Sequence, residues 1–358
     1  MFLENVANSY LTLITLISFL IFLMINKLSL NRIFNLFLDE DYNKPQAFHK
    51  SSTPRVGGLA SIISLTVLFF SYDFFFKTQV NDYIFFSLIF FFLGFIDDIK
   101  ISLKPSIRLI IMIVVIPISI SLFDITISLT GFRILNDWLE NSFFNYIFVT
   151  LCFLFIINGC NLIDGFNGLL IIHLIIINSV FLFLHLIGNN LEYSYFLIGQ
   201  IFVMFCFLLF NFPNAKMFLG DGGAYLFGAL TSLNAIKTSI NFTEISPIFF
   251  ATLLSYIFFE VFFSFFRKLR NKASPLKPDS SHLHMLLFKN ISQKFTRYPN
   301  PMTSIIINFS FLIFIMPLIF YRHDGWICKI IFLFMTIFYL YFYNFLSKKQ
   351  NFTSNENN

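Results

Sequence analysis

Residues 148–184 read FVTLCFLFII NGCNLIDGFNGL LIIHLIIINSVFLFL, and this stretch already indicates the kind of fold. Two apolar runs flank residues 158–169, which hold four amide or acid side chains and three glycines. The runs are too long and unbroken for alternating strands, so they indicate membrane-spanning helices, whose backbone is satisfied within lipid. Membrane-spanning helices do not account for the polar side chains of residues 158–169, which must have another role.

The composition indicates an integral membrane protein. Of 358 residues, 57% are hydrophobic and only 12% are charged, whereas soluble domains hold about a quarter charged residues. Four cysteines lie in or beside apolar runs without CxxC spacing, which predicts buried free thiols and excludes a zinc site or a disulfide scaffold. They are Cys152, Cys160, Cys206 and Cys328.

Apolar runs long enough to cross a bilayer fall at 10–26, 57–72, 82–96, 107–123, 143–157, 168–187, 194–210, 222–240, 247–266, 304–320 and 326–346. The sequence thus predicts an all-α integral membrane protein, a bundle of ten or eleven transmembrane helices in a single domain over residues 1–346. Residues 347–358 are polar, and we expect a disordered tail there. A homodimer is neither predicted nor excluded, because lipid-facing and partner-facing Phe look alike.

The basic residues predict the orientation. With the N-terminus outside, 19 of the 24 Lys and Arg residues fall on the cytoplasmic side, as the positive-inside rule requires. The net charge of +5 then reflects topology and gives no support to nucleic acid as a partner. We expect a multi-pass protein of the cell inner (plasma) membrane, surrounded by membrane lipid, with its active-site loops facing the cytoplasm.

The unusual polar stretches share that side. A carboxylate forced into hydrocarbon costs about 2.5–3.5 kcal/mol, so acids at helix ends normally have partners. The stretches are HKSSTPRVGGLA (49–60), GFIDDIKISLK (94–104), NGCNLIDGFNGL (158–169), NFPNAKMFLGDGGAYLFG (211–228) and SPLKPDSSHLHMLLF (274–288).

Two groups of acids and amides stand out in these stretches. Asp97 and Asp98 are adjacent, so on a helix they point about 100° apart, and their mutual repulsion asks for a cation or a proton; a solvated helix end is the alternative. Asn161, Asp164 and Asn167 are spaced i, i+3, i+6. On a helix or turn they form one stripe of oxygen donors suited to Mg²⁺ or a ribose, or else a polar seam between helices.

Two further motifs supply anion-binding and basic groups. Asp221 lies among glycines in FLGDGG, where backbone N–H groups at a helix start can hold an anion and the acid can hold a metal; a capping Asp is the alternative. His282 and His284 lie near Lys277 and Lys289. They are too few for zinc and suit a diphosphate, or an exposed basic loop near anionic lipid.

Together these groups match the needs of phosphoryl transfer, which are a metal that bridges phosphates, positioned donors and a nucleophile held in line. In this order, TPRVGG, GFIDD, NLIDGFNGL, FLGDGG and PDSSHLH resemble the polyprenyl-phosphate N-acetylhexosamine-1-phosphate transferases, relatives of the phospho-MurNAc-pentapeptide transferases. The resemblance covers roughly residues 10–320.

The resemblance implies a Mg²⁺-dependent enzyme, with Mn²⁺ as an alternative ion. It would transfer N-acetylhexosamine-1-phosphate from a UDP-N-acetylhexosamine to undecaprenyl phosphate, with release of UMP, and so initiate a cell-surface polysaccharide such as O-antigen. By position, Asp221 matches the main metal ligand and Asn161 a second metal contact. The implied catalytic acids are Asp97, Asp98 and Asp164, and the implied substrate-binding residues are Phe218 (on uracil), Asn167, Lys104, Arg108, His282 and His284.

Some positions depart from the family pattern. Asn167 stands where many members have a second Asp, so it cannot act as a base. Lys100 and Ile101 occupy the region of an acid that often follows the Asp pair, and Met285 stands where a third histidine sometimes occurs. The last difference favours simple UDP-N-acetylhexosamines over the MurNAc-pentapeptide substrate.

Two other classes remain open from the sequence. Glycine and acid interruptions of helices also mark the binding sites of secondary transporters, although those sites lie near the midplane and need access from both sides. A metal-free scaffold of a polysaccharide assembly complex would tolerate loss of the acids.

Overall fold

The computed structural model describes residues 2–29, 37–39, 52–101, 103–275, 277, 279–294 and 297–356. Its elements are α1 (Phe2–Ser29), β1 (Leu38–Asp39), β2 (Thr53–Pro54), α2 (Gly57–Phe76), α3 (Asn81–Asp98), α4 (Pro105–Leu122), α5 (Arg133–Leu139), α6 (Ser142–Ile163), α7 (Leu169–Ile187), α8 (Leu191–Asn211), α9 (Gly220–Asn241), α10 (Pro247–Leu253), α11 (Ser255–Arg270), α12 (Leu283–Lys294), α13 (Pro299–Phe320) and α14 (Gly325–Glu356). The two short strands pair antiparallel. Every apolar run predicted to span the membrane is helical.

Within the described ranges, eight helices are long and apolar enough to cross a membrane. The pair α10 and α11, which are bent by 68° relative to each other, counts as a ninth if the two helices form one broken span. The predicted spans 82–96 and 222–240 correspond to α3 and α9, which do not meet the same criterion; α3 carries three aspartates, and α9 is rich in Gly, Ser and Thr. The protein is therefore an all-α, multi-pass membrane protein, as predicted.

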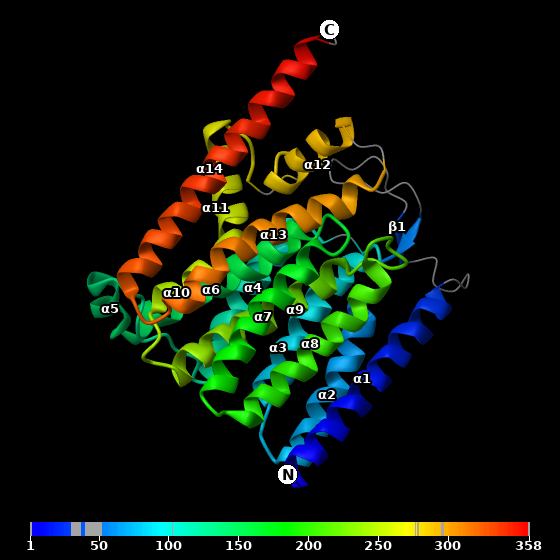
Figure 1. Cartoon of the computed structure of the whole chain (residues 1–358), viewed down its shortest axis with the longest axis vertical. Coiled ribbons are helices and arrows are strands. Elements are labelled where there is room, and N and C mark those ends of the chain that lie inside the picture. Colours follow the sequence, from blue (N-terminus) through cyan, green and yellow to red (C-terminus); the bar gives the residue numbers. More distant parts are fainter. Residues whose placement is uncertain are drawn as a thin grey trace.

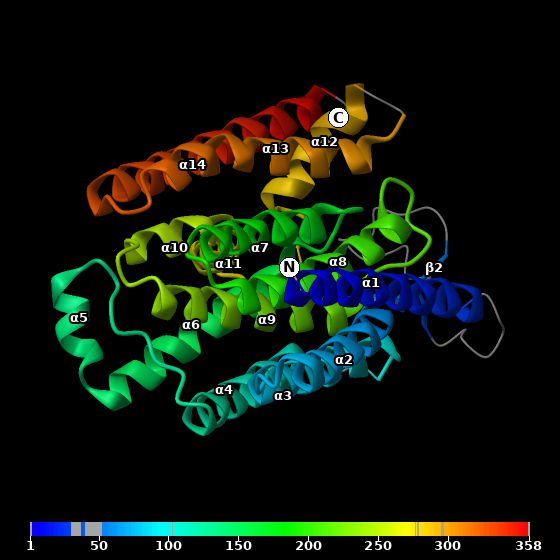
Figure 2. The same cartoon turned by 60° about the horizontal axis from the view of Figure 1, so that its bottom comes forward.

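Helix α9 lies at the centre of the bundle. Residues 222–236 are buried without a break, and a helix buried on all sides belongs to the interior. It packs against α2, α3, α6 and α7. In Figure 2, α13 and α14 form the uppermost layer and α2, α3 and α4 the lowest, with α9 between them. The first turn of α9, which carries Asp221, is thus held by several neighbours.

Small residues let these neighbours approach closely. A Cβ atom added at Gly94 of α3 would lie 2.4 Å from the backbone of Asp221, and one at Gly58 of α2 would lie 2.5 Å from the backbone nitrogen of Gly223. A Cβ at Gly159 of α6 would lie 2.4 Å from Ile257 of α11. Gly159 of the polar stretch 158–169 therefore serves the packing of α6 against α11.

The two chain ends lie at opposite ends of the bundle, and α5 lies at the end away from β1 and α12 (Figure 1). Helix α14 continues to Glu356, so the structure has helix over most of the segment 347–358 that we expected to be a disordered tail. Residues 49–51 of the first polar stretch lie outside the described ranges.

Candidate active site

Arg108 joins two of the predicted acids. Its Nη1 atom lies 2.6 Å from Oδ2 of Asp97 and 2.7 Å from Oδ2 of Asp221. Asp97 lies in the last turn of α3, Arg108 in the first turn of α4, and Asp221 in the first turn of α9. All three side chains keep a partial exposure of 15–25%. Residues far apart in the sequence therefore meet in one ion cluster that water and small ligands can reach.

The side chain of Asp98 points toward the backbone at the start of α9 and is buried. Its two carboxylate oxygens each accept one backbone N–H bond, from Asp221 and Gly222, at 2.9 Å. This carboxylate caps the N-terminus of α9 from a neighbouring helix. Gly220 has φ of +78°, and a Cβ atom there would lie 2.6 Å from Asp98, so only glycine suits the position.

These contacts answer two alternatives left by the sequence. The Asp97–Asp98 pair is not a solvated helix end, because both side chains are bonded and Asp98 is 3% exposed. Asp221 is not a capping Asp, because the capping carboxylate is that of Asp98 while the Asp221 side chain accepts from Arg108. The carboxylate predicted to bind a metal is thus turned toward the ion cluster.

Backbone hydrogen bonds join the first polar stretch to the FLGDGG motif. Phe218 donates to the carbonyl of Pro54 at 2.8 Å, and Gly57 and Gly58 donate to the carbonyls of Phe218 and Leu219 at 2.9 and 2.8 Å. The half-buried Phe218 is therefore fixed beside Arg55.

Arg55 is a site residue that the sequence did not single out. Its guanidinium contacts Asp39 at 2.6 Å and lies 4.0 Å from Asp98. Its place in TPRVGG, next to two glycines at a helix start, was the available signal.

The fifth loop follows α6 and adds a third carboxylate. Asp164 lies at the C-terminus of α6. Burial, with a smaller contribution from Asp221, raises the pKa of Asp164 to about 7, and Arg55 works against that rise. Asp164 is therefore close enough to interact electrostatically with both Asp221 and Arg55.

The predicted stripe of Asn161, Asp164 and Asn167 is broken, because α6 ends at Ile163. The side chain of Asn167 donates to the carbonyl of Pro213 at 2.8 Å, and its backbone N–H donates to Asn300 at 2.8 Å. Asn167 thus joins its own loop to the loop after α8 and to the first turn of α13. Asn161 stays on the last turn of α6 and is half-buried.

The ninth loop joins α11 to α12, and the two histidines where it runs into α12 are buried, not exposed. His282 is 1% exposed and His284 is 0% exposed. Nδ1 of His282 lies 2.9 Å from Oε2 of Glu260 in α11. The ring of His284 meets Phe166 of the fifth loop edge to face, with centroids 5.6 Å apart. The ninth loop therefore reaches the fifth, and the alternative of an exposed basic loop does not hold for the histidines.

Among the substrate-binding candidates, Lys104 is exposed at the start of α4. Lys289 bonds to Ser280 at 3.0 Å, which fixes the ninth loop. Glu260, which pairs with the histidines, was missed from the sequence. The available signal was that it is the single acid in the apolar run 247–266.

A magnesium ion fits this donor set when phosphate oxygens complete it. Within the described ranges, no group of three or more His, Cys, Asp or Glu side chains is arranged to hold a metal ion alone. Two carboxylates, those of Asp97 and Asp221, converge on one guanidinium nitrogen of Arg108. Mg²⁺ commonly takes one or two carboxylates plus substrate phosphates and water, which matches what is present.

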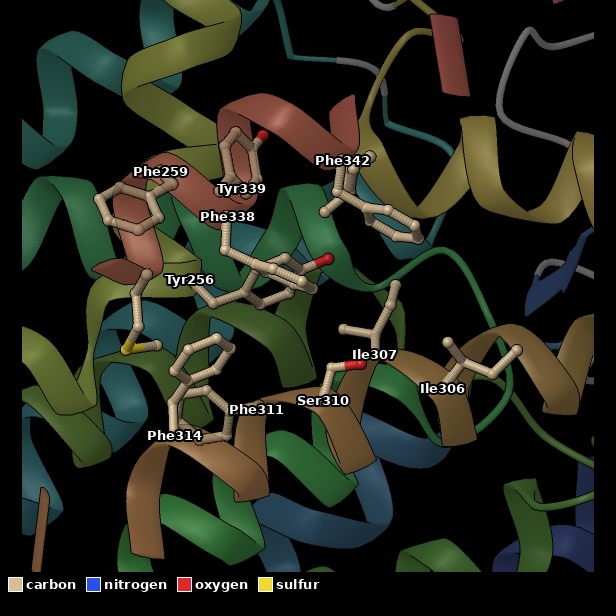
Figure 3. Close-up of a pocket in the computed structure, with 12 residues that line it drawn as sticks. Tyr256, Phe259, Ile306, Ile307, Ser310, Phe311, Phe314, Phe338, Tyr339 and Phe342 are labelled. Carbon is tan, nitrogen blue, oxygen red and sulfur yellow. The ribbon is translucent and has the colours of Figure 1, made fainter. Parts of the chain in front are cut away.

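An apolar pocket of about 60 Å³ lies elsewhere, between α11, α12, α13 and α14. Its walls are mostly aromatic, including Tyr256, Phe311, Phe338 and Tyr339, which come together from three helices in Figure 3. No acid or base lines it. This pocket has no charged group to bind phosphate, so the candidate site is the ion cluster.

The chain is thus a multi-pass membrane protein with a cluster of acids and arginines at one end of its bundle. Residues 80–239, which include Asp97, Arg108 and Asp221, match the model for glycosyl transferase family 4. The undecaprenyl-phosphate alpha-N-acetylglucosaminyl 1-phosphate transferase of Thermotoga maritima is 31% identical over 258 residues, covering 72% of this chain and 75% of that protein. A phospho-N-acetylmuramoyl-pentapeptide-transferase of Dictyoglomus thermophilum is 30% identical over 276 residues, covering 72% and 84%.

The chain belongs to the family of polyprenyl-phosphate N-acetylhexosamine-1-phosphate transferases, within glycosyl transferase family 4, and is a sugar-phosphate transferase. The resemblance seen in its motifs is confirmed.

Proposed function

We propose that the protein transfers N-acetylhexosamine-1-phosphate from a UDP-amino sugar, such as UDP-GlcNAc, to undecaprenyl phosphate and releases UMP. An oxygen of the lipid phosphate attacks the β-phosphorus of the donor. The bond from that phosphorus to the oxygen bridging the α- and β-phosphates breaks, and UMP leaves with the electron pair. The product is a sugar-diphospholipid.

The observation that carries this proposal is the junction of Asp97, Arg108 and Asp221. This junction lies at the end of the bundle where α3 ends and α4 and α9 begin. It places a carboxylate suited to a metal beside a guanidinium suited to phosphate. A lipid phosphate and a nucleotide diphosphate could meet there. The membrane orientation we propose, in the inner membrane with this end toward the cytoplasm, would give the UDP-sugar direct access.

Each residue has a role in this proposal. Asp221, with Asn161 as a second contact, would hold Mg²⁺, which would supply positive charge to neutralise the donor phosphates. Asp98 fixes the backbone of Asp221 and so positions its carboxylate. Asp97 orients or deprotonates the lipid phosphate.

Other residues bind the substrates. Arg108 stabilises the negative charge that develops on the transferred phosphate. Phe218 stacks on uracil, and Asp164 belongs to the nucleotide site. The relative from Thermotoga maritima, whose name gives N-acetylglucosaminyl 1-phosphate as the transferred group, supports GlcNAc over other sugars. A product of this kind would initiate a cell-surface polysaccharide.

A donor panel tests the proposal. Purified protein in detergent is mixed with undecaprenyl phosphate and UDP-GlcNAc, UDP-GalNAc or UDP-MurNAc-pentapeptide, and UMP release is measured with Mg²⁺, with EDTA, and with Mg²⁺ restored. We expect UMP from an N-acetylhexosamine donor, lost with EDTA and regained with Mg²⁺. Release from UDP-MurNAc-pentapeptide alone would reassign the donor, and no release from any donor would refute the proposal.

The placement of the motifs argues against a secondary transporter. Transporter sites lie near the membrane midplane with access from both sides, whereas the motifs here gather at one end of the bundle. Uptake of a UDP-sugar into proteoliposomes without UMP formation would favour a transporter.

A further inference from the structure

Glu260 is a carboxylate placed where apolar residues surround it. It belongs to α11, the second half of the bent span, and its side chain is 1% exposed. A buried carboxylate without partners is strongly unfavourable. Its partners therefore indicate why the chain holds an acid here.

Those partners all come from the ninth loop and the start of α12. Oε2 accepts from Nδ1 of His282 at 2.9 Å, and Oε1 accepts from the backbone N–H of Leu283 at 3.2 Å. Nδ1 of His284 lies 3.8 Å from Oε1. One carboxylate thus fixes the first residue of α12 and faces the same nitrogen of both rings.

The opposite nitrogen of each ring is left over. Both Nε2 atoms are buried and make no hydrogen bond, and Nδ1 of His284 has only the longer contact with Glu260. Nε2 of His284 faces the fifth loop, since a Cβ atom at Gly165 would lie 3.6 Å from it. Nε2 of His282 lies 3.5 Å from Oδ1 of Asp279. The His284 ring is therefore presented to the loop that follows Asp164.

We propose that Glu260 is a positioning residue: it holds His282 and His284 so that Nε2 of His284 donates a hydrogen bond to a phosphate oxygen of the sugar-nucleotide donor. This rests on the proposed function and adds to it. A carboxylate on one side of an imidazole sets its orientation and favours the doubly protonated ring. Burial lowers the pKa of His284, and Glu260 opposes that shift.

The test is the kinetics of Glu260→Gln in the full-length protein. Gln keeps the shape and an acceptor oxygen but removes the charge. We expect kcat/KM for the UDP-sugar to fall about 10–100-fold, mainly through a higher KM for the UDP-sugar, with the KM for undecaprenyl phosphate unchanged. Asp82→Asn is the matched control, because Asp82 is also a buried acid paired with a base, Lys237, and it lies in the first turn of the helix whose last turn carries Asp97. It should leave both KM values unchanged.

A double-mutant cycle separates positioning from a purely structural role. If Glu260 acts through the histidines, Glu260→Gln should change kcat/KM less than twofold in a His282→Gln/His284→Gln background. The inference is overturned if Glu260→Gln keeps the wild-type KM, or if it costs the same factor with and without the histidines. If Glu260→Gln does not fold, His284→Gln alone must raise the same KM. Failure of the wild-type protein to release UMP would instead refute the proposed function.

Discussion

The two ends of α3 and α9 carry buried polar groups of opposite character. At one end, four carboxylates contact two guanidiniums: Asp39 and Asp98 lie beside Arg55, and Asp97 and Asp221 beside Arg108. Asp164 adds a further acid nearby. At the other end, Asp82 pairs with Lys237, whose ammonium lies 4.6 Å from the ring centre of Tyr83.

Hydrogen bonds between neutral side chains also join the helices at the far end. Tyr83 donates to Asn234 at 2.8 Å, and Asn234 donates to Asn178 at 2.7 Å and Gln200 at 3.0 Å. Its one acid and one base balance, which is what polar groups that join helices require. Among the described residues, the ion cluster at the near end holds five carboxylates and two guanidiniums. Such an excess of negative charge within a cluster persists only where a further cation or a proton balances it. The imbalance, not the presence of charge, marks the site.

The largest effect should follow from removing the charge of Asp221. Asp221→Asn is expected to reduce UMP release by about 10³-fold, because the variant loses a ligand for the cation that balances the phosphates. Thermal unfolding in detergent should stay close to wild type, since the helix cap is provided by Asp98. Wild-type turnover in this variant would show that the excess charge has another purpose.

The next largest effect should distinguish the adjacent acids. Asp98→Ala removes the acceptor of two backbone N–H groups and should lower the free energy of unfolding by about 1–3 kcal/mol. It should also lower turnover, because the backbone of Asp221 loses its support. Asp97→Ala should lower turnover with under about 1 kcal/mol lost, since its ion pair is partly exposed. Unfolding temperature and UMP release are measured for both, and equal destabilisation would contradict the assignment of Asp98 as a cap.

The sequence predicted the helices and the gathering of the polar stretches well, because both follow from local composition. Apolar runs need no partner to be recognised, and helices that alternate in direction bring every second loop to the same end. The separate roles of Asp97 and Asp98 could not be read, since two identical neighbours differ only in what the folded chain places beside them. The break after Ile163, which moves Asn167 off the predicted stripe, also depends on packing of the fifth loop.

Glu260 shows a different kind of omission. Its partners His282 and Leu283 lie more than twenty positions away and meet it only because α11 bends from α10 and the chain returns through the ninth loop. The rule that acids in apolar segments need partners applied to it, but the partner itself is a tertiary fact. Arg55 likewise depends on the pairing of its segment with the motif around Phe218.

A smaller effect concerns pH. The pKa of Asp164 is raised to about 7, above the ordinary carboxyl value of about 4. The folded state therefore holds a proton that the unfolded chain has released, and the stability linked to that proton is present below pH of about 4 and is lost as pH rises to about 7. Unfolding temperatures without Mg²⁺, measured from pH 5 to 8, should fall less in Asp164→Asn than in wild type. Identical slopes would place Asp164 in a more solvated environment.

The smallest effect on turnover should come from the far end. The double substitution Asp82→Asn/Lys237→Met removes both charges together, and replacing a balanced buried pair in this way is often close to neutral for stability. Turnover per folded molecule should stay within twofold of wild type, measured as UMP release from protein of matched monodispersity. Lys237→Met alone would leave Asp82 unpaired and should lower the unfolding temperature more than the double variant does. If the double variant instead lost turnover as Asp221→Asn does, the two clusters would act together along α9, and the contrast between a balanced joint and an unbalanced site would fail.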